Sequence, residues 1–231
     1  MKNLCITLHL KTPLIPGKYP LNLDGLLYWA AYEGHKESDD AALEVLAKAL
    51  DSENGVFKSS DLIYLQTPEG SIHQTTAVFP TTMQWREYKH PMAKRSIMEL
   101  GGPYRSRLTS YSAISAQAVR FYAVGDADLI YYLLDSVLCI GRGNNQGHGE
   151  ISEIVIEEIK QDLSWYRLDK RSGEVELQRC LPVVIAEKVD ALASTIANLP
   201  VTTVRSKPPY TSGPDHIGYS TTFKREVLRF I

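Results

Sequence analysis

The stretch FYAVGDADLIYYLLDSVLCIGRGNNQGHGEI, residues 121–151, contains the clearest structural pattern of the chain. It begins within an alternating run, AVRFYAV, that is typical of a half-buried strand. Gly125 ends that strand, and Asp126 is a suitable N-cap for a helix whose apolar residues share one broad face. A glycine-rich segment at 141–149 separates this helix from a second strand-like run, ISEIVIEEI. The stretch therefore predicts the order strand, helix, glycine loop, strand.

The residues before this stretch supply the remaining elements of a known supersecondary pattern. Strict alternation at residues 4–11 predicts a first strand, and helices are predicted from Asn22 and from Ser38 to a break at Asn54-Gly55. Short apolar runs over 56–78 predict a hairpin about Pro68-Glu69-Gly70. Together these elements follow the order β-α-β-β-α-β, which predicts an α+β, ferredoxin-like fold.

In this arrangement the helices cover one face of the sheet, and the other face is free for a ligand. His9, Arg120 and Tyr122 are expected on that free face. Asp24, in the first turn of its helix, is expected to be structural.

We expect residues 1–160 to form this domain, with an insertion at about 80–112 and a C-terminal extension over 161–231 packed on the same domain. Within the extension, a strand pair is predicted around 165–184 and a helix over 189–199. The chain has 231 residues, 44% of them hydrophobic and 23% charged, which is the composition of a folded globular protein.

The predicted insertion differs from the rest of the chain in its charge. Residues 86–107 contain six basic and two acidic side chains, so this segment carries +4 in a chain whose net charge is −2. Aromatic residues are interleaved with the cations. Cationic groups neutralise phosphates and aromatic rings stack on unpaired bases, so the pattern favours contact with single-stranded nucleic acid. A solvated charged loop is the alternative interpretation. The residues concerned are Trp85, Arg86, Lys89, Lys94, Arg95, Arg105 and Arg107.

The glycine loop GRGNNQGHG, residues 141–149, is the other candidate site. Four glycines allow positive φ angles and close approach of a ligand, so the amides are expected to form an anion-binding nest. Further donors come from Arg142, Asn144, Asn145, Gln146 and His148. The loop lacks the third glycine of the dinucleotide fingerprint and the Gly-Lys-Ser/Thr of a P-loop. The alternative is that the glycines form only a helix C-cap and a tight turn.

A glycine-rich loop between the second helix and last strand of such a domain resembles the RAMP superfamily of CRISPR-associated RNA-binding proteins. PLNLDGLLYWA after the first strand and the quoted stretch 121–151 strengthen the likeness. Together they look most like the subunit of type IV CRISPR effector complexes that caps the 5′ handle of the guide RNA.

The resemblance implies a non-catalytic subunit that binds CRISPR RNA and adjoins backbone and large subunits, and it leaves open a contact with target DNA near its flanking motif. It assigns RNA contact to residues 142–148 of the loop, and the insertion matches a thumb-like element of relatives. Arg120, on the free sheet face, joins the predicted RNA-binding residues.

Two other functions remain open. Some relatives cleave precursor guide RNA without a metal, and His35 stands where such a general acid or base is expected. A small-molecule enzyme or nucleotide-binding domain that uses the glycine loop is the third hypothesis. We expect no cofactor and no metal, since the three cysteines are too scattered for a zinc site. We also expect a cytoplasmic protein without a membrane span.

Overall fold

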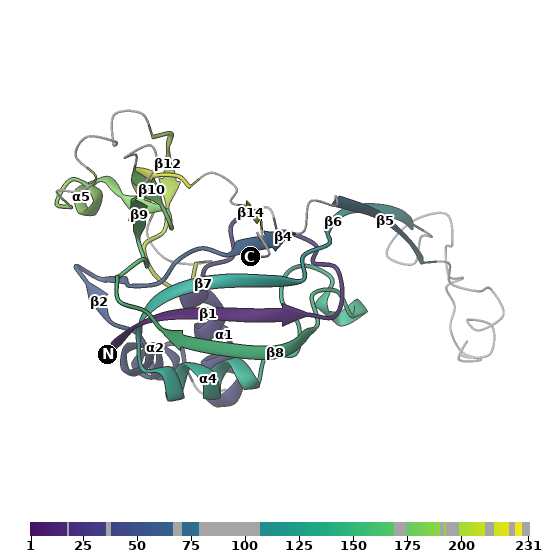
Figure 1. The fold of residues 1–231 in the computed structure, drawn as a ribbon, viewed down its shortest axis with the longest axis horizontal. Coiled ribbons are helices and arrows are strands. Elements are labelled where there is room, and N and C mark those ends of the chain that lie inside the picture. Colours follow the sequence, from purple (N-terminus) through teal and green to yellow (C-terminus); the bar gives the residue numbers. More distant parts are fainter. Residues whose placement is uncertain are drawn as a thin grey trace, which may run out of the picture.

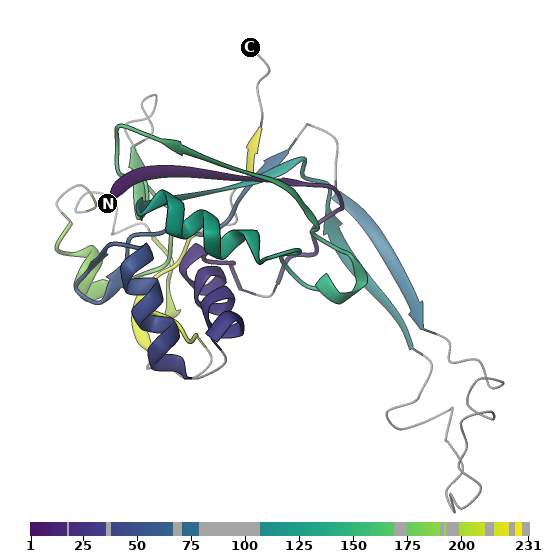
Figure 2. The same cartoon turned by 90° about the horizontal axis from the view of Figure 1, so that it is seen from below.

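The main body of the molecule is one sheet with helices packed on one side of it (Figures 1 and 2). A two-stranded arm projects from one end of the sheet, and small sheets of the C-terminal third lie at the other end (Figure 1). The computed structural model describes residues 1–17, 19–35, 38–66, 71–78, 107–168, 175–189, 192, 199–210, 215–221 and 225–227.

The central sheet has five strands in the order β14-β4-β7-β1-β8. All neighbours pair antiparallel except β14 and β4, which are parallel. The strands are β1 (Lys2–Leu10), β4 (Ile63–Gln66), β7 (Ala118–Gly125), β8 (Ile151–Glu158) and β14 (Arg225–Val227). The α+β class is confirmed. Strands β1, β4, β7 and β8 follow the predicted β-α-β-β-α-β connectivity, and β14 adds an edge strand beside β4.

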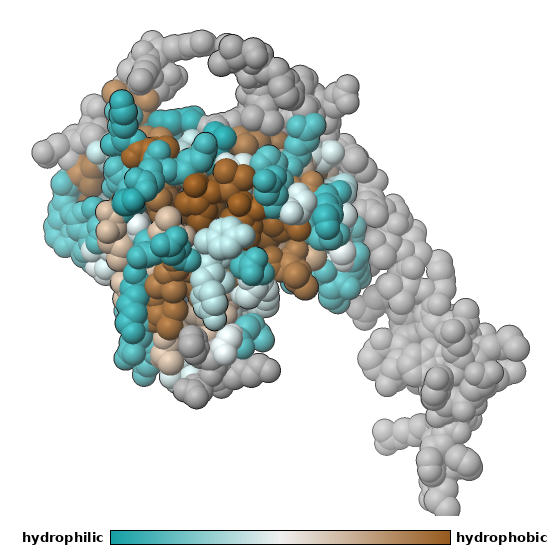
Figure 3. Space-filling view, turned by 60° about the horizontal axis from the view of Figure 1, so that its bottom comes forward, coloured by the Kyte–Doolittle hydropathy of each residue, from teal (hydrophilic) through white to brown (hydrophobic). Residues whose placement is uncertain are grey.

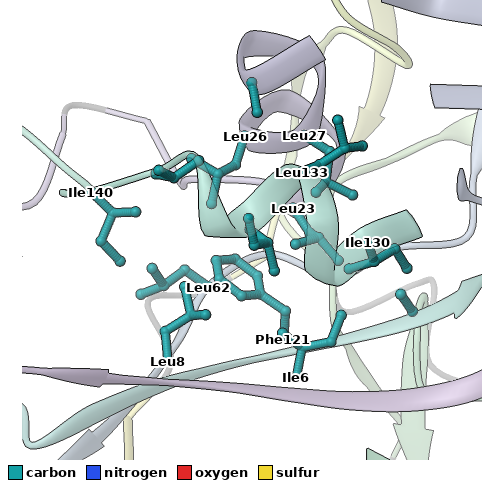
Figure 4. Close-up of a cluster of buried hydrophobic side chains, with 14 of the residues drawn as sticks. Ile6, Leu8, Leu23, Leu26, Leu27, Leu62, Phe121, Ile130, Leu133 and Ile140 are labelled. Atoms are coloured by element: carbon teal, nitrogen blue, oxygen red, sulfur yellow. The ribbon is translucent and has the colours of Figure 1, made fainter. Parts of the chain in front are cut away.

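Alternation along β1 decides which side chains meet the helices. Leu4, Ile6 and Leu8 are fully buried in the main core and pair across to the apolar positions of β7. Figure 4 shows Ile6 and Leu8 beside Phe121 in this core. Their neighbours along the strand project to the opposite face, because successive strand residues alternate. Cys5 and Tyr122 pack together there, and Arg120 lies beside them. The predicted division of β1 and β7 into two faces is therefore confirmed.

Three helices cover the face of the sheet from which Leu4, Ile6 and Leu8 project (Figure 2). Ser38 caps the second through its Oγ, which accepts from the Ala41 amide at 3.2 Å, and Asp126 caps the third by accepting from Leu129 at 3.0 Å. Both capping residues were predicted. The helices are α1 (Leu23–His35), α2 (Asp39–Ala49) and α4 (Ala127–Asp135).

The second helix ends earlier than its apolar pattern predicts. It stops at Ala49, and a small hairpin follows, formed by β2 (Ser52–Glu53) and β3 (Val56–Phe57). Asn54 and Gly55 between these strands have φ of 53° and 79°. Left-handed values at both positions form the turn that best joins two twisted strands, so Asn-Gly specifies a hairpin here rather than a simple helix stop.

The predicted hairpin over 56–78 is wrong in its pairing. Within the described residues, β4 pairs with β7 and β14, while β5 (Ser71–Val78) pairs antiparallel with β6 (Arg107–Ile114) to form the projecting arm. The two arm strands match in length, and their register runs without a break from Ser71↔Ile114 to Val78↔Arg107. In the sequence, these two strands flank residues 79–106, which lie outside the described residues.

The C-terminal extension contains short strands around a second apolar cluster that includes Trp165, Leu181 and Val56. The predicted pair around 165–184 is confirmed as β9 and β10. The predicted helix over 189–199 falls mostly outside the described residues. The elements are β9 (Tyr166–Leu168), β10 (Val175–Leu177), β11 (Leu181–Pro182), α5 (Val183–Ala186), β12 (Val201–Val204) and β13 (His216–Tyr219).

A buried ion pair joins the extension to α1. The side chains of Arg179 and Asp24 are fully buried, with Nη2 and Oδ2 3.2 Å apart. The Tyr210 hydroxyl donates to Asp24, with its oxygen 2.8 and 2.7 Å from the two carboxylate oxygens, and Arg179 also donates to the Phe57 carbonyl at 2.8 Å. Burial is the largest single influence and lowers the pKa of Arg179, but Asp24, Tyr210 and Asp61 together outweigh it, so the pKa of Arg179 is raised. The predicted structural role of Asp24 is thus explained.

Candidate nucleic-acid interface

The glycine loop is a compact turn between α4 and β8. Its centre is one turn of 3₁₀ helix, Asn144–Gln146, flanked by Gly143 and Gly147 with φ of 70° and 81°. These left-handed values reverse the chain on both sides of the turn and are accessible to glycine at low cost.

Residues 12–15 pack against the loop and bind its backbone through hydrogen bonds. The Arg142 amide donates to the Ile15 carbonyl at 2.9 Å, and the Gly149 amide donates to the Pro13 carbonyl at 3.0 Å. Thr12 Oγ1 donates to the Gly147 carbonyl at 2.7 Å and accepts from the Glu150 amide at 2.9 Å. The sequence TPLI reads only as turn-rich, so it gives no sign that it forms the platform of this loop.

The predicted open nest of amides is not what the loop presents. The amides at 142 and 145–150 donate to carbonyl or side-chain oxygens of the protein itself. His148 is 7% exposed and lies under Gly143, so it is a packing residue in this arrangement. The glycines therefore do form a tight turn, as the alternative interpretation held. The side chains that the loop leaves exposed are those of Arg142, Asn144, Asn145 and Gln146.

The same short segment connects the loop to the arm. Leu14 pairs with Ile114 at the end of β6, through amide–carbonyl bonds of 3.0 and 2.7 Å, while Ile15 pairs with Arg142. The glycine loop and the base of the arm are thus held at one end of the sheet, where the arm leaves the body (Figure 1). No pattern in the sequence indicates this proximity, since the partners are far apart along the chain.

Most of the predicted basic site lies outside the described residues. This applies to Trp85, Arg86, Lys89, Lys94, Arg95 and Arg105. Arg107 is the first residue of β6, so its backbone lies on the arm. The assignment of these residues to RNA contact stays a prediction.

Arg120 belongs to a different part of the surface. It projects from β7 onto the face without helices, with its Nε 3.5 Å from Thr7 Oγ1. There it lines a depression together with side chains from β1, β7, β8 and the segment after β8. Glu157, Lys160 and Gln161 line the same depression, and no motif in the sequence marks them.

The described part of the chain contains no group of three His, Cys, Asp or Glu residues suited to hold a metal ion. His35 is the last residue of α1. In the described helices no segment is both long and apolar enough to cross a bilayer.

Comparison with known proteins identifies one family. The family model described as "CRISPR type IV associated protein Csf3" matches residues 2–180. No curated protein matches the chain. Among solved structures, a chain of the "Type III-B Cmr-beta bound to cognate target RNA" is similar, with a TM-score of 0.40 and 11% identity. The alignment covers 68% of this chain and 61% of that one, and at this level it carries no functional conclusion.

Proposed function

We propose that this chain, which belongs to the Csf3 family of CRISPR type IV associated proteins, is a non-catalytic subunit that binds guide RNA within a type IV ribonucleoprotein. The family match confirms the resemblance to type IV CRISPR proteins drawn from the sequence. In the proposed role the chain caps the 5′ handle of the guide and adjoins backbone and large subunits. A contact with target DNA near its flanking motif belongs to the same proposal.

One observation carries this proposal: the exposed polar side chains of the glycine loop and the base of the arm share the platform at residues 12–15. In the sequence, the two strands of the arm flank the segment that combines cations and aromatic rings. An RNA strand laid across this end of the sheet would meet Arg142 and three amide side chains on one side and the arm on the other. Guanidinium groups pair with phosphates, and amides donate to and accept from bases.

We expect Arg142→Ala to weaken RNA retention and to reduce its salt dependence. Each cation that neutralises a phosphate adds about one unit to the slope of log affinity against log salt, so one lost contact should lower that slope by about one. The measurement is the RNA bound per protein, after co-expression with the guide array and neighbouring proteins, across a salt series.

Lys48→Ala is the matched control, because Lys48 is exposed on α2 and also carries one positive charge. It should leave the slope unchanged. Equal slopes for Arg142→Ala and wild type would contradict a role of the loop in RNA binding. A wild-type protein that carries no RNA would instead favour the small-molecule hypothesis.

We also expect the purified protein to leave repeat RNA uncut in EDTA. The assay is incubation of labelled repeat RNA with the protein, followed by a denaturing gel. A defined cut that disappears in His35→Ala would support the alternative, a metal-independent endoribonuclease that processes precursor guide RNA.

A further inference from the structure

The sheet face without helices has a depression of about 510 Å³, which lies within the usual range for small-ligand sites. Its lining comes from β1, β7, β8 and the segment after β8, and it combines apolar, cationic and anionic groups. The charged residues of the lining are Arg120, Glu157 and Lys160.

The floor of this depression is apolar and fixed. Cys5 and Tyr122, 6% and 7% exposed, are neighbours on β1 and β7 and pack against Ile63. Ile159 and Leu163, from the segment that follows β8, pack against this cluster. Two bonds to Asn3 anchor that segment: the Ile159 amide donates to the Asn3 carbonyl at 2.9 Å, and Asn3 Nδ2 donates to the Lys160 carbonyl at 3.3 Å.

Charged groups stand around this floor in a specific arrangement. Arg120 reaches it from β7, while Glu157 and Lys160 reach it from the opposite side, at the end of β8. Glu157 is the register partner of Cys5, so its side chain projects from the same face of the sheet, beside the apolar floor. A ligand that fits has a flat apolar body, an anionic group for the cations, and N–H donors for the carboxylate.

We propose that this depression binds one unstacked guanine nucleotide of the RNA; the inference rests on the proposed function. Two adjacent donors on the Watson–Crick edge of guanine, N1–H and N2–H₂, match the two oxygens of the Glu157 carboxylate. Adenine and cytosine place one donor beside a ring nitrogen that accepts, and uracil places its single donor between two carbonyls, so each brings an acceptor against the carboxylate. The base lies on the apolar floor, and its phosphate meets Arg120 or Lys160. Recognition of splayed bases by their Watson–Crick edge is common in RNA-binding proteins.

The test uses fluorescein-labelled pentamers, UUGUU, UUAUU, UUCUU and UUUUU, and the full chain, with fluorescence polarisation as the readout. UUGUU should bind at least about fivefold more tightly than the others, since a bidentate contact discriminates by such factors. Glu157→Gln should remove this preference, and Lys160→Ala should weaken all four pentamers alike. Glu153→Gln, on the same strand but outside the lining, and Lys48→Ala are the controls.

Equal affinity for the four pentamers, no binding of any pentamer, or a guanine preference that survives in Glu157→Gln would overturn the inference. These results leave the proposed function standing if wild-type protein still retains guide RNA on co-expression and Arg142→Ala reduces that retention. Loss of retained guide RNA altogether would remove the proposed function as well.

Discussion

Arg179→Met should lower the free energy of unfolding by about 3–5 kcal/mol. The substitution keeps an unbranched apolar stem and removes the guanidinium group, which leaves Asp24 buried without its cation. It also deprives the Phe57 and Ser59 carbonyls of a donor at 2.8 and 3.3 Å. Urea unfolding followed by circular dichroism gives the change, with an unaltered m-value as evidence that only stability has changed.

A double-mutant cycle separates the ion pair from the packing of the long side chain. Asp24→Asn removes the anion and keeps the shape, so Arg179→Met should cost less in that background than in the wild type. If the losses of unfolding free energy caused by the two substitutions simply add, this pair is not the link between α1 and the extension. Arg167→Met is a matched control, because Arg167 pairs with Glu176 near the surface, where ion pairs contribute about 0–1 kcal/mol.

The contrast between Asp24 and Arg179 shows what local sequence can and cannot predict. The adjacent apolar pattern predicts that Asp24 lies in the first turn of a helix, and a structural role is expected from that position. Its partners lie 155 and 186 residues further along the chain, and no period or spacing connects them. Local patterns also located β1, β7, α4 and both caps, because alternation, helical spacing and capping chemistry act over a few residues.

Pairing choices were harder to predict for the same reason. The run IHQTTAV and the turn signal before it fit a hairpin with the preceding strand equally well, yet β5 pairs with β6, which begins 29 residues after β5 ends. The glycine loop shows the corresponding limit for a site. The sequence shows its glycines and hydrogen-bond donors, but not the platform at residues 12–15 that accepts hydrogen bonds from its amides. An anion-binding nest was therefore predicted where the loop forms a closed turn.

Gly149→Ala should destabilise the protein far more than Gly147→Ala, although both glycines have left-handed φ, 66° and 81°. A side chain at either position costs about 1–2 kcal/mol in backbone strain. At Gly147 nothing lies within 4 Å of the added Cβ, so that cost is the whole effect. At Gly149 the Cβ would stand 2.1 Å from the Ile140 carbonyl oxygen and 2.8 Å from Leu14 Cδ1.

The clash at Gly149 involves backbone and therefore cannot be relieved by a rotamer change. The loop must move off its platform, which breaks the Gly149–Pro13 bond of 3.0 Å and the Ile140–Gly149 bond of 2.9 Å. We expect a total loss of about 3–5 kcal/mol, the range of severe single substitutions. Urea midpoints of the two variants measure the difference, and RNA retention measures whether the exposed loop side chains have moved. Similar midpoints for the two variants would mean that the glycines serve only the turn, and that close packing on residues 12–15 does not hold the loop.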